Sequence, residues 1–150
     1  DSSLKEENLD AFTQRFLKLA ADEIIPEQMT PQIDIDAVLD LQDINAKFMS
    51  ELKKMNPFGP DNQKPVFCSL GVKDYGTSKL VGKDLEHIKL ELIDDKSNTP
   101  IHGIAFGMHQ HNTHIKNMKP FNICYTIEEN TYNGNTSLQL MVKDIKENDI

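Results

Sequence analysis

Five stretches of alternating apolar and polar residues follow residue 57, and no other feature of this sequence constrains its fold as strongly. They span residues 65–72, 87–93, 101–106, 121–127 and 138–145. A period of two is typical of strands that bury one face and leave the other in water. A polar, histidine-rich stretch at residues 108–116 lies between the third and the fourth, where it predicts a short helix or a loop.

Residues 132–135 connect the last two stretches and read Tyr-Asn-Gly-Asn. Asn-Gly is the strongest short signal for a β-hairpin, because both central residues of the turn need a positive φ. Five strands with one helical segment between the third and the fourth match the OB-fold, a five-stranded Greek-key barrel. Strand counting alone leaves other small barrels open. We therefore predict an α+β, mostly β fold, with an OB-fold barrel preceded by a helical segment and one extra strand.

Residues 1–56 follow a different pattern. Apolar residues spaced by three and four predict amphipathic helices over residues 6–24 and 45–55, and alternation predicts one strand over residues 32–38. The sequence Pro-Phe-Gly-Pro at residues 57–60 then prevents any helix from continuing. We place a domain boundary at the start of this sequence.

The chain of 150 residues is acidic, with a formal net charge of -8, and its hydrophobic content of 38% allows one modest core. Residues 1–56 contain twelve acidic and six basic side chains, so most of the net negative charge lies outside the predicted barrel. Net negative charge argues against avid nucleic-acid binding, since contacts to phosphates supply most non-specific affinity. Only a local stripe of basic residues would overcome this charge.

Features of exported or membrane proteins are missing from the sequence. No apolar run approaches the roughly 18 residues of a membrane span, and the N-terminal residues lack the basic and apolar regions of a signal peptide. Cys68 and Cys124 lie within apolar stretches without a C-x-x-C spacing, which predicts buried thiols in a reducing compartment. We therefore expect a cytoplasmic protein without membrane contact.

The outward side chains of the second and third strands, with the flanking loops, form the usual ligand face of an OB-fold. Ammonium groups on this face can follow phosphates, and aromatic rings can stack on unpaired bases. The predicted nucleic-acid-binding residues are Lys79, Lys83, His87, Lys89, Tyr132, Asn133 and Gln139. The alternative is that the lysines and His87 are plain surface residues and that Tyr132 packs across its hairpin. Phe106 shares a face with His102 and Ile104, and we expect it in the core.

Neither a metal site nor an active site is complete in the sequence. The cluster of His109, His111 and His114 has the wrong spacing for three ligands on one helix face, so we expect a solvated loop there. No G-x-S-x-G, P-loop, G-x-G-x-x-G or H-E-x-x-H motif is present. We predict no catalytic residue and no metal ligand in this chain, and a self-contained enzyme is the least favoured hypothesis.

Several segments of the sequence are similar to the motifs of one known family. Residues 52–67 read LKKMNPFGPDNQKPVF, which resembles L-x-x-L-x-P-F-G-x-G-N-x-x-P-x-F, with Asp61 in place of the second glycine. Residues 81–90 read VGKDLEHIKL, which resembles V-G-x-x-x-x-H-L-K-L. These motifs are those of RecJ-type single-stranded-DNA-specific exonucleases. Residues 104–107 and 128–140 look like the later strands of that family, and residues 7–12 look like a helix of its DHH-associated domain.

The resemblance implies that this chain is an accessory C-terminal fragment. The family carries metal-dependent catalysis in an upstream DHH domain, where Asp and His bind manganese or magnesium, and none of those motifs occurs here. Residues 1–56 would end the DHH-associated domain, and residues 57–150 would be an OB-fold nucleic-acid-binding domain. The implied function is the non-catalytic, single-stranded-DNA-binding portion of a 5′-to-3′ exonuclease of DNA repair and recombination, inactive alone. The alternative is a protein-interaction module that docks on the upstream nuclease core or on a repair partner.

Overall fold

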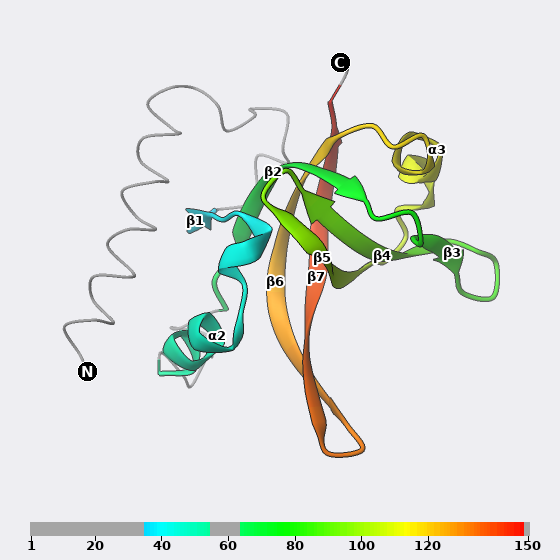
Figure 1. Cartoon of the computed structure of the whole chain (residues 1–150). Coiled ribbons are helices and arrows are strands. Elements are labelled where there is room, and N and C mark those ends of the chain that lie inside the picture. Colours follow the sequence, from blue (N-terminus) through cyan, green and yellow to red (C-terminus); the bar gives the residue numbers. More distant parts are fainter. Residues whose placement is uncertain (1–34, 55–63, 149–150) are drawn as a thin grey trace.

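The structure, a computed structural model, describes residues 35–54 and 64–148 (Figure 1). The helix predicted over residues 6–24 and the Pro-Phe-Gly-Pro sequence lie outside these ranges. Within them, no helix is both long enough and apolar enough to cross a membrane. The elements in chain order are β1 (Ala37–Val38), the 3-10 helix η1 (Leu41–Asp43), α2 (Ala46–Lys53), β2 (Phe67–Asp74), β3 (Lys79–Val81), β4 (His87–Asp94), β5 (Ser97–Ala105), the 3-10 helix η2 (His109–His111), α3 (Asn112–Lys116), β6 (Phe121–Tyr132) and β7 (Asn135–Glu147).

Five of the strands form a closed barrel (Figure 1). β2 pairs antiparallel with both β4 and β6, and β4 pairs antiparallel with β5. β7 closes the ring, because it runs parallel to β5 and antiparallel to β6. The η2–α3 segment lies between β5 and β6 in the chain. This strand order and helix position are those of the OB-fold, so the predicted fold class is confirmed.

Two short strands extend the barrel into a seven-stranded sheet. β1 pairs parallel with β2, and Val38 lies opposite Cys68. The alternation of residues 32–38 predicts a strand here but does not decide whether it joins the barrel. β3 was not predicted, and it pairs antiparallel with β4 from Lys79 to Val81. It therefore builds a hairpin onto the strand that carries the predicted ligand face.

Alternate residues of the strands fill the barrel interior. On β4, Ile88, Leu90 and Leu92 are fully buried, as the alternation predicts. Tyr125 of β6 is the largest fully buried side chain of the described residues, and its hydroxyl lies 2.7 Å from that of Ser69. Burial raises the pKa of this phenol above its ordinary value, so it stays protonated and bonded to Ser69.

A bulge in β2 overturns one part of the alternation argument. The pattern of residues 65–72 places Cys68 and Val72 on one face, but the two lie in separate hydrophobic clusters. Gly71 adopts a φ of +68°, and the β2–β6 register shifts between Ser69 and Val72. An extra residue in one strand reverses the face on which the following side chains lie. Val72 therefore joins the barrel core, whereas Cys68 packs outside it beneath β1.

The segment before the barrel packs against it through η1 and α2. Asn45 caps α2, since its side-chain oxygen accepts the backbone N–H of Phe48 at 2.9 Å. The Phe48 ring packs edge-to-face on Phe67 of β2, with 5.5 Å between the ring centroids. The Asp94 carboxylate accepts the backbone N–H of Leu41 at 2.9 Å. The second predicted helix is thus confirmed, and this segment shares the hydrophobic core of the barrel.

Candidate nucleic-acid interface

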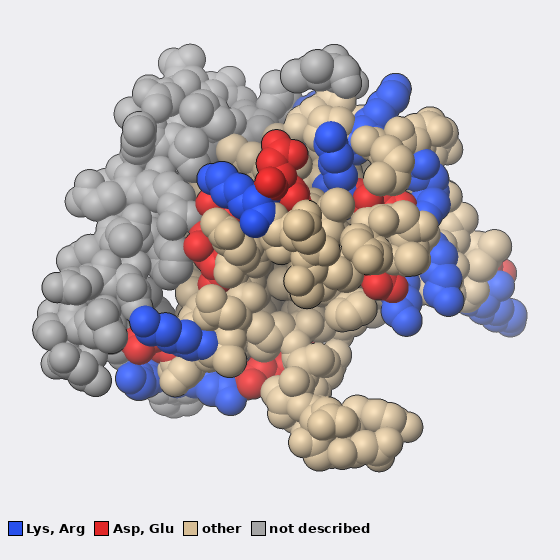
Figure 2. Space-filling model, in the orientation of Figure 1, with Lys and Arg blue, Asp and Glu red and all other residues tan. Residues whose placement is uncertain are grey.

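The β3–β4 hairpin carries four of the seven predicted site residues. Lys79 and Lys89 lie directly opposite each other in the two strands, and both are exposed. Lys83 is exposed in the turn, and His87 begins β4. Figure 2 shows basic side chains gathered at this end of the molecule. The two opposed lysines form a positive patch. Like charges directly opposite each other on a sheet are destabilising, so a phosphate bound at this patch would relieve the repulsion between them.

Phe106 is an exposed aromatic ring beside this positive patch, so the expectation of a core position is wrong. β5 ends at Ala105, and 57% of the Phe106 surface is exposed. Gly103 and Ala105 take the inward positions, which puts Phe106 on the outward side. Its ring meets that of His87 edge-to-face, with 5.0 Å between the centroids and 77° between the planes. An exposed ring beside ammonium groups is the combination that binds unpaired bases and their phosphates.

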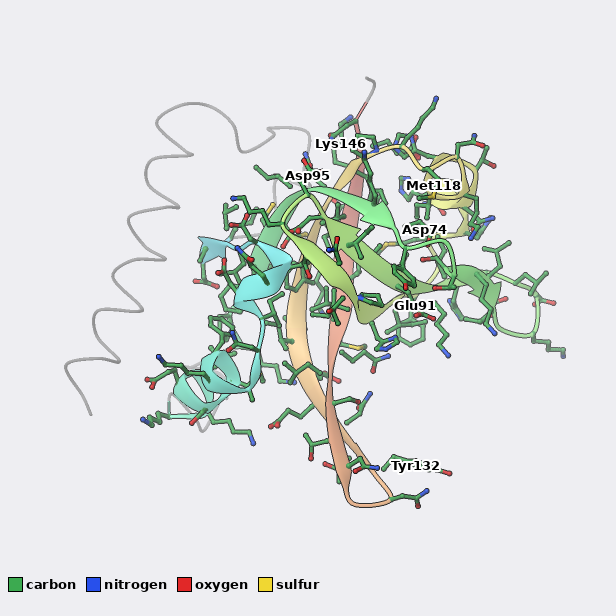
Figure 3. All side chains as sticks on the ribbon, viewed as in Figure 1. Asp74, Glu91, Asp95, Met118, Tyr132 and Lys146 are labelled. Carbon is green, nitrogen blue, oxygen red and sulfur yellow. The ribbon has the colours of Figure 1, made fainter. Side chains whose placement is uncertain are left out.

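The loop between β2 and β3 presents another exposed aromatic ring, Tyr75, which was not among the predicted site residues. Asp74, directly before it, is fully buried (Figure 3). The carboxylate of Asp74 accepts the Ser78 N–H at 3.0 Å and the Lys116 ammonium at 2.9 Å. Burial alone would raise the pKa of Asp74, but these bonds and one from Gly76 lower it below 3.8. An ionised carboxylate therefore anchors this loop to α3.

The outward face of β4 is not uniformly basic. Glu91 lies opposite His102 of β5, and Nδ1 of His102 is 3.8 Å from Oε2 of Glu91 (Figure 3). Glu91 follows Lys89 by two residues and so shares its face. The carboxylate of Glu91 therefore limits the positive patch to the part of β4 that pairs with β3.

The other three predicted site residues lie on the β6–β7 hairpin. Tyr132 is 78% exposed near the tip (Figure 3). Asn133 and Gly134 form the turn with φ of +52° and +79°, as predicted for Asn-Gly. Gln139 lies nearer the barrel, where its Oε1 accepts a hydrogen bond from Asn130 at 2.6 Å. The tip of the hairpin projects from the barrel (Figure 1), so Tyr132 and Asn133 lie apart from the lysines, whereas Gln139 pairs with His102 of β5.

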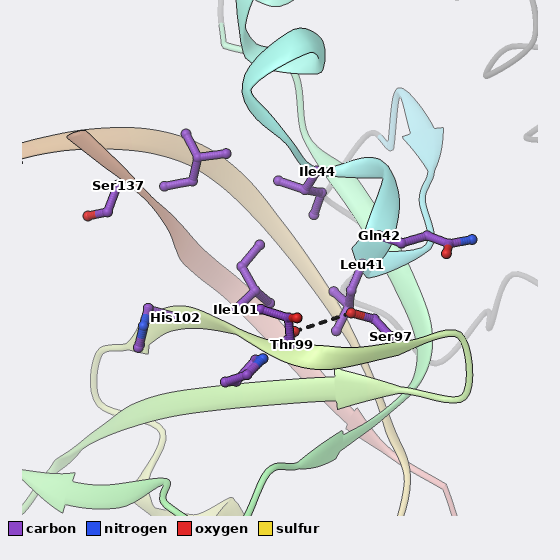
Figure 4. Close-up of a pocket in the computed structure, with 10 residues that line it drawn as sticks. Leu41, Gln42, Ile44, Ser97, Thr99, Ile101, His102 and Ser137 are labelled. Atoms are coloured by element: carbon purple, nitrogen blue, oxygen red, sulfur yellow. Dashed lines mark hydrogen bonds between the residues drawn. The ribbon is translucent and has the colours of Figure 1, made fainter. Parts of the chain in front are cut away.

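A cavity of about 410 Å³ lies where η1 meets β5 and β7 (Figure 4). Leu41, Ile44, Ile101 and Leu138 supply its apolar lining, and His102 is among its polar residues. Of the described residues, no Asp, Glu, Lys or Arg side chain lines it. The cavity therefore offers no charged group from this part of the chain that would bind a phosphate or a metal ion.

Two histidines of the cluster, His111 and His114, contact other parts of the fold, so the segment is not the solvated loop that we expected. Nδ1 of His111 lies 2.6 Å from Oε2 of Glu147, and Nδ1 of His114 lies 3.4 Å from Oε1 of the same carboxylate. Nε2 of His114 is 2.8 Å from the carbonyl oxygen of Pro120. These contacts connect the η2–α3 segment to the end of β7. In the ranges that the structure describes, no group of three or more His, Cys, Asp or Glu side chains is arranged to hold a metal ion.

Comparisons with known families and proteins agree with this fold. The model of the family described as "RecJ OB domain" matches residues 35–144. The chain is 25% identical over 144 residues to the single-stranded-DNA-specific exonuclease RecJ of Haemophilus influenzae, and 25% identical over 143 residues to that of Bacillus subtilis. These matches cover 96% and 95% of this chain but only 25% and 18% of the two relatives. The chain thus spans a quarter or less of the length of these curated relatives.

Two solved structures of RecJ from Thermus thermophilus are also similar to this chain. The crystal structure in complex with Mn2+ has a TM-score of 0.60 at 16% identity, over 87% of this chain and 18% of that one. The crystal structure in complex with Mg2+ has a TM-score of 0.57 at 14% identity, over 87% and 19%. At these identities the similarity concerns the fold alone.

Proposed function

Because this chain belongs to the RecJ OB domain family, we propose that it is the non-catalytic, single-stranded-DNA-binding portion of a single-stranded-DNA-specific exonuclease. The parent enzyme would degrade DNA strands from the 5′ end in repair and recombination, in the cytoplasm. Manganese or magnesium would act in an upstream DHH domain. This portion would add affinity and keep the strand directed toward that domain, and it would be inactive alone.

One observation carries the proposal: the opposed Lys79 and Lys89 lie beside the exposed ring of Phe106 on a single outward face. Ammonium groups that follow phosphates and a ring that stacks on bases bind unpaired DNA without reading its sequence. A general exonuclease needs this tolerance, because it must accept every base that reaches it. A further exposed ring, Tyr132, lies on the β6–β7 hairpin, the loop that flanks this face in an OB-fold.

The net charge of -8 is compatible with this proposal once its distribution is considered. Residues 64–148 contain ten lysines and ten carboxylates, so the barrel itself is close to neutral. Tethering a weak binder beside an active site raises its effective concentration. Modest affinity in the isolated chain is therefore sufficient for the proposed role.

The test is a titration of labelled oligo-dT of about 16 nucleotides, the upper site size of one OB-fold, against a duplex of the same length. We expect single-strand binding that weakens between about 50 and 200 mM salt. In the variant K79A/K89A, the slope of log affinity against log salt should fall by about 1.4, because two phosphate contacts are lost. Absence of single-strand binding at the lower salt concentration would refute the proposal.

A matched control separates the positive patch from charge in general. Lys47 and Lys54 are exposed near α2, on the other side of the barrel from β3 (Figure 1). The variant K47A/K54A loses the same two charges, and its salt slope should stay that of the unchanged chain. Equal slopes in the two double variants would contradict a site on the β3–β4 hairpin. Absence of single-strand binding would instead favour the alternative function, in which the chain docks on protein.

A further inference from the structure

His87 has both ring nitrogens engaged within the protein. Nδ1 accepts the backbone N–H of Gly107 at 2.8 Å. A backbone N–H can only donate, so Nδ1 is unprotonated and the proton of the neutral ring lies on Nε2. Nε2 is 3.0 Å from Oε1 of Glu86. Neither nitrogen is therefore free to bind a phosphate, which differs from the DNA-contacting role predicted for this residue.

The same ring supports Phe106, the neighbour of Gly107. The two rings meet edge-to-face at 77°, with 5.0 Å between their centroids. Phe106 follows the last residue of β5 and is more than half exposed. The hydrogen bond to Gly107 fixes the backbone beside Phe106, and the His87 ring fixes the aromatic plane.

Gly82, which directly follows β3, packs against Glu86 and His87. It has a φ of +100°, and a Cβ there would lie 2.7 Å from Oε1 of Glu86 and 3.0 Å from Cδ2 of His87. Any side chain at this position would displace the His87 ring or its Glu86 partner. One packing arrangement thus brings Val81, Gly82 and His87 together with Phe106 and Gly107.

We propose that His87 is a positioning residue, which holds the Phe106 ring in place for stacking on an unpaired base and does not itself contact DNA. This inference rests on the proposed function. It gives a reason for the contact between residues 81–90 and residues 104–107, which are about twenty residues apart in the chain. The role requires the neutral ring, because protonated Nδ1 cannot accept from Gly107.

The experiment is a double-mutant cycle on oligo-dT affinity with the whole 150-residue chain, using H87A, F106A and both together. Loss of one stacked base costs about fivefold or more in affinity. We expect H87A to lose a similar factor to F106A, and the double variant to bind no more weakly than F106A. Losses that multiply would mean that His87 binds DNA independently, which would overturn the inference. H102A, at the exposed histidine of β5, is the control, and its effect should multiply with that of F106A.

A second measurement tests the positioning without DNA. The Gly107 amide should be protected from hydrogen exchange at neutral pH in the unchanged chain and unprotected in H87A. H87N keeps an amide oxygen as acceptor, so it should restore protection of the Gly107 amide. An unprotected Gly107 amide in the unchanged chain would overturn the inference.

The DNA affinities also separate the two proposals. If F106A binds DNA normally, the proposed stacking face itself fails. If F106A binds more weakly and H87A does not, only the role of His87 fails.

Discussion

At the scale of single residues, the ionised carboxylate of Asp74 organises the loop between β2 and β3. Its carboxylate is fully buried and accepts hydrogen bonds from Ser78 and Lys116. Lys116 also donates to the carbonyl oxygens of Gly76 at 3.2 Å and Ser78 at 2.8 Å. One ammonium group from α3 thus holds three acceptors at and after the end of β2, beside the exposed Tyr75.

We predict that D74N lowers the free energy of unfolding by about 2 kcal/mol near neutral pH, because hydrogen bonds to a charged group are lost. The pKa of Asp74 is lowered in the folded chain. Its stabilisation is therefore present above the ordinary value of 3.8 and disappears as the pH falls through the lower folded value. Urea unfolding of both chains near neutral pH and at about pH 3 should show the difference shrink. D95N, at an exposed carboxylate, should unfold like the unchanged chain at both.

Among the elements, α2 has its buried face against the barrel. Phe48, Met49 and Leu52 are buried and belong to the same core as the barrel strands. We predict that F48A lowers the free energy of unfolding by about 3 to 5 kcal/mol, since it removes a buried ring and leaves a cavity beside Phe67. K47A, one residue earlier and exposed, should change it by less than about 0.5 kcal/mol. Equal stability of the two variants in urea unfolding would show that α2 folds independently of the barrel.

The β6–β7 hairpin tip can be shortened without disturbing its register. Removing residues 131, 132, 135 and 136 keeps the Asn133-Gly134 turn and joins it to the Asn130–Ser137 pair. Two residues leave each strand, so the alternation of faces is preserved. All removed residues are exposed, so we predict unchanged unfolding but oligo-dT affinity lower by about 1 to 3 kcal/mol, the value of one stacked base.

The substitution Y132A separates the ring from the rest of the hairpin tip. Fluorescence titration with oligo-dT should give Y132A the same loss as the shortened hairpin. If the shortened chain loses affinity and Y132A does not, the contact comes from the backbone or from Asn133 rather than from stacking.

At the scale of the whole molecule, Cys68 and Cys124 report on the junction between the N-terminal segment and the barrel. They lie opposite each other in β2 and β6, and both pack with Val38 of β1. Both thiols are free and fully buried, as predicted. Burial raises the pKa of each to about 12, with a further contribution from the neighbouring Cys124 for Cys68 and from Asp144 for Cys124.

We predict that a thiol reagent labels neither cysteine in the native chain at about pH 8, because labelling needs an accessible thiolate. In increasing urea, labelling should follow the same midpoint as the loss of circular dichroism, since segment and barrel share one core. Labelling at a lower urea concentration would mean that β1 detaches first. The two parts would then be separate units, as the predicted boundary at residue 57 suggests.

Much of the barrel follows from local patterns. The buried positions of β4 and the Asn133-Gly134 turn were predicted correctly, because strand alternation and positive φ are properties of a few neighbouring residues. The helix capped by Asn45 was also predicted, because the spacing of its apolar residues by three and four is likewise a local property. The strings at residues 81–90 and 104–107 indicate the family because each motif is short and continuous in the chain.

The positions of Phe106 and Val72 depended on contacts between distant strands. In β5 the inward side is set by Gly103, where an added Cβ would lie 3.2 Å from Leu140 of β7, so only a small residue fits there. That contact turns Phe106 outward, toward His87. In β2, the bulge at Gly71 reverses the faces halfway along the strand. Sequence alone determined which residues alternate and where the chain turns, since these are local properties. Only the closed barrel decided which side of each strand faces inward, because that depends on the space left by strands far away in the chain.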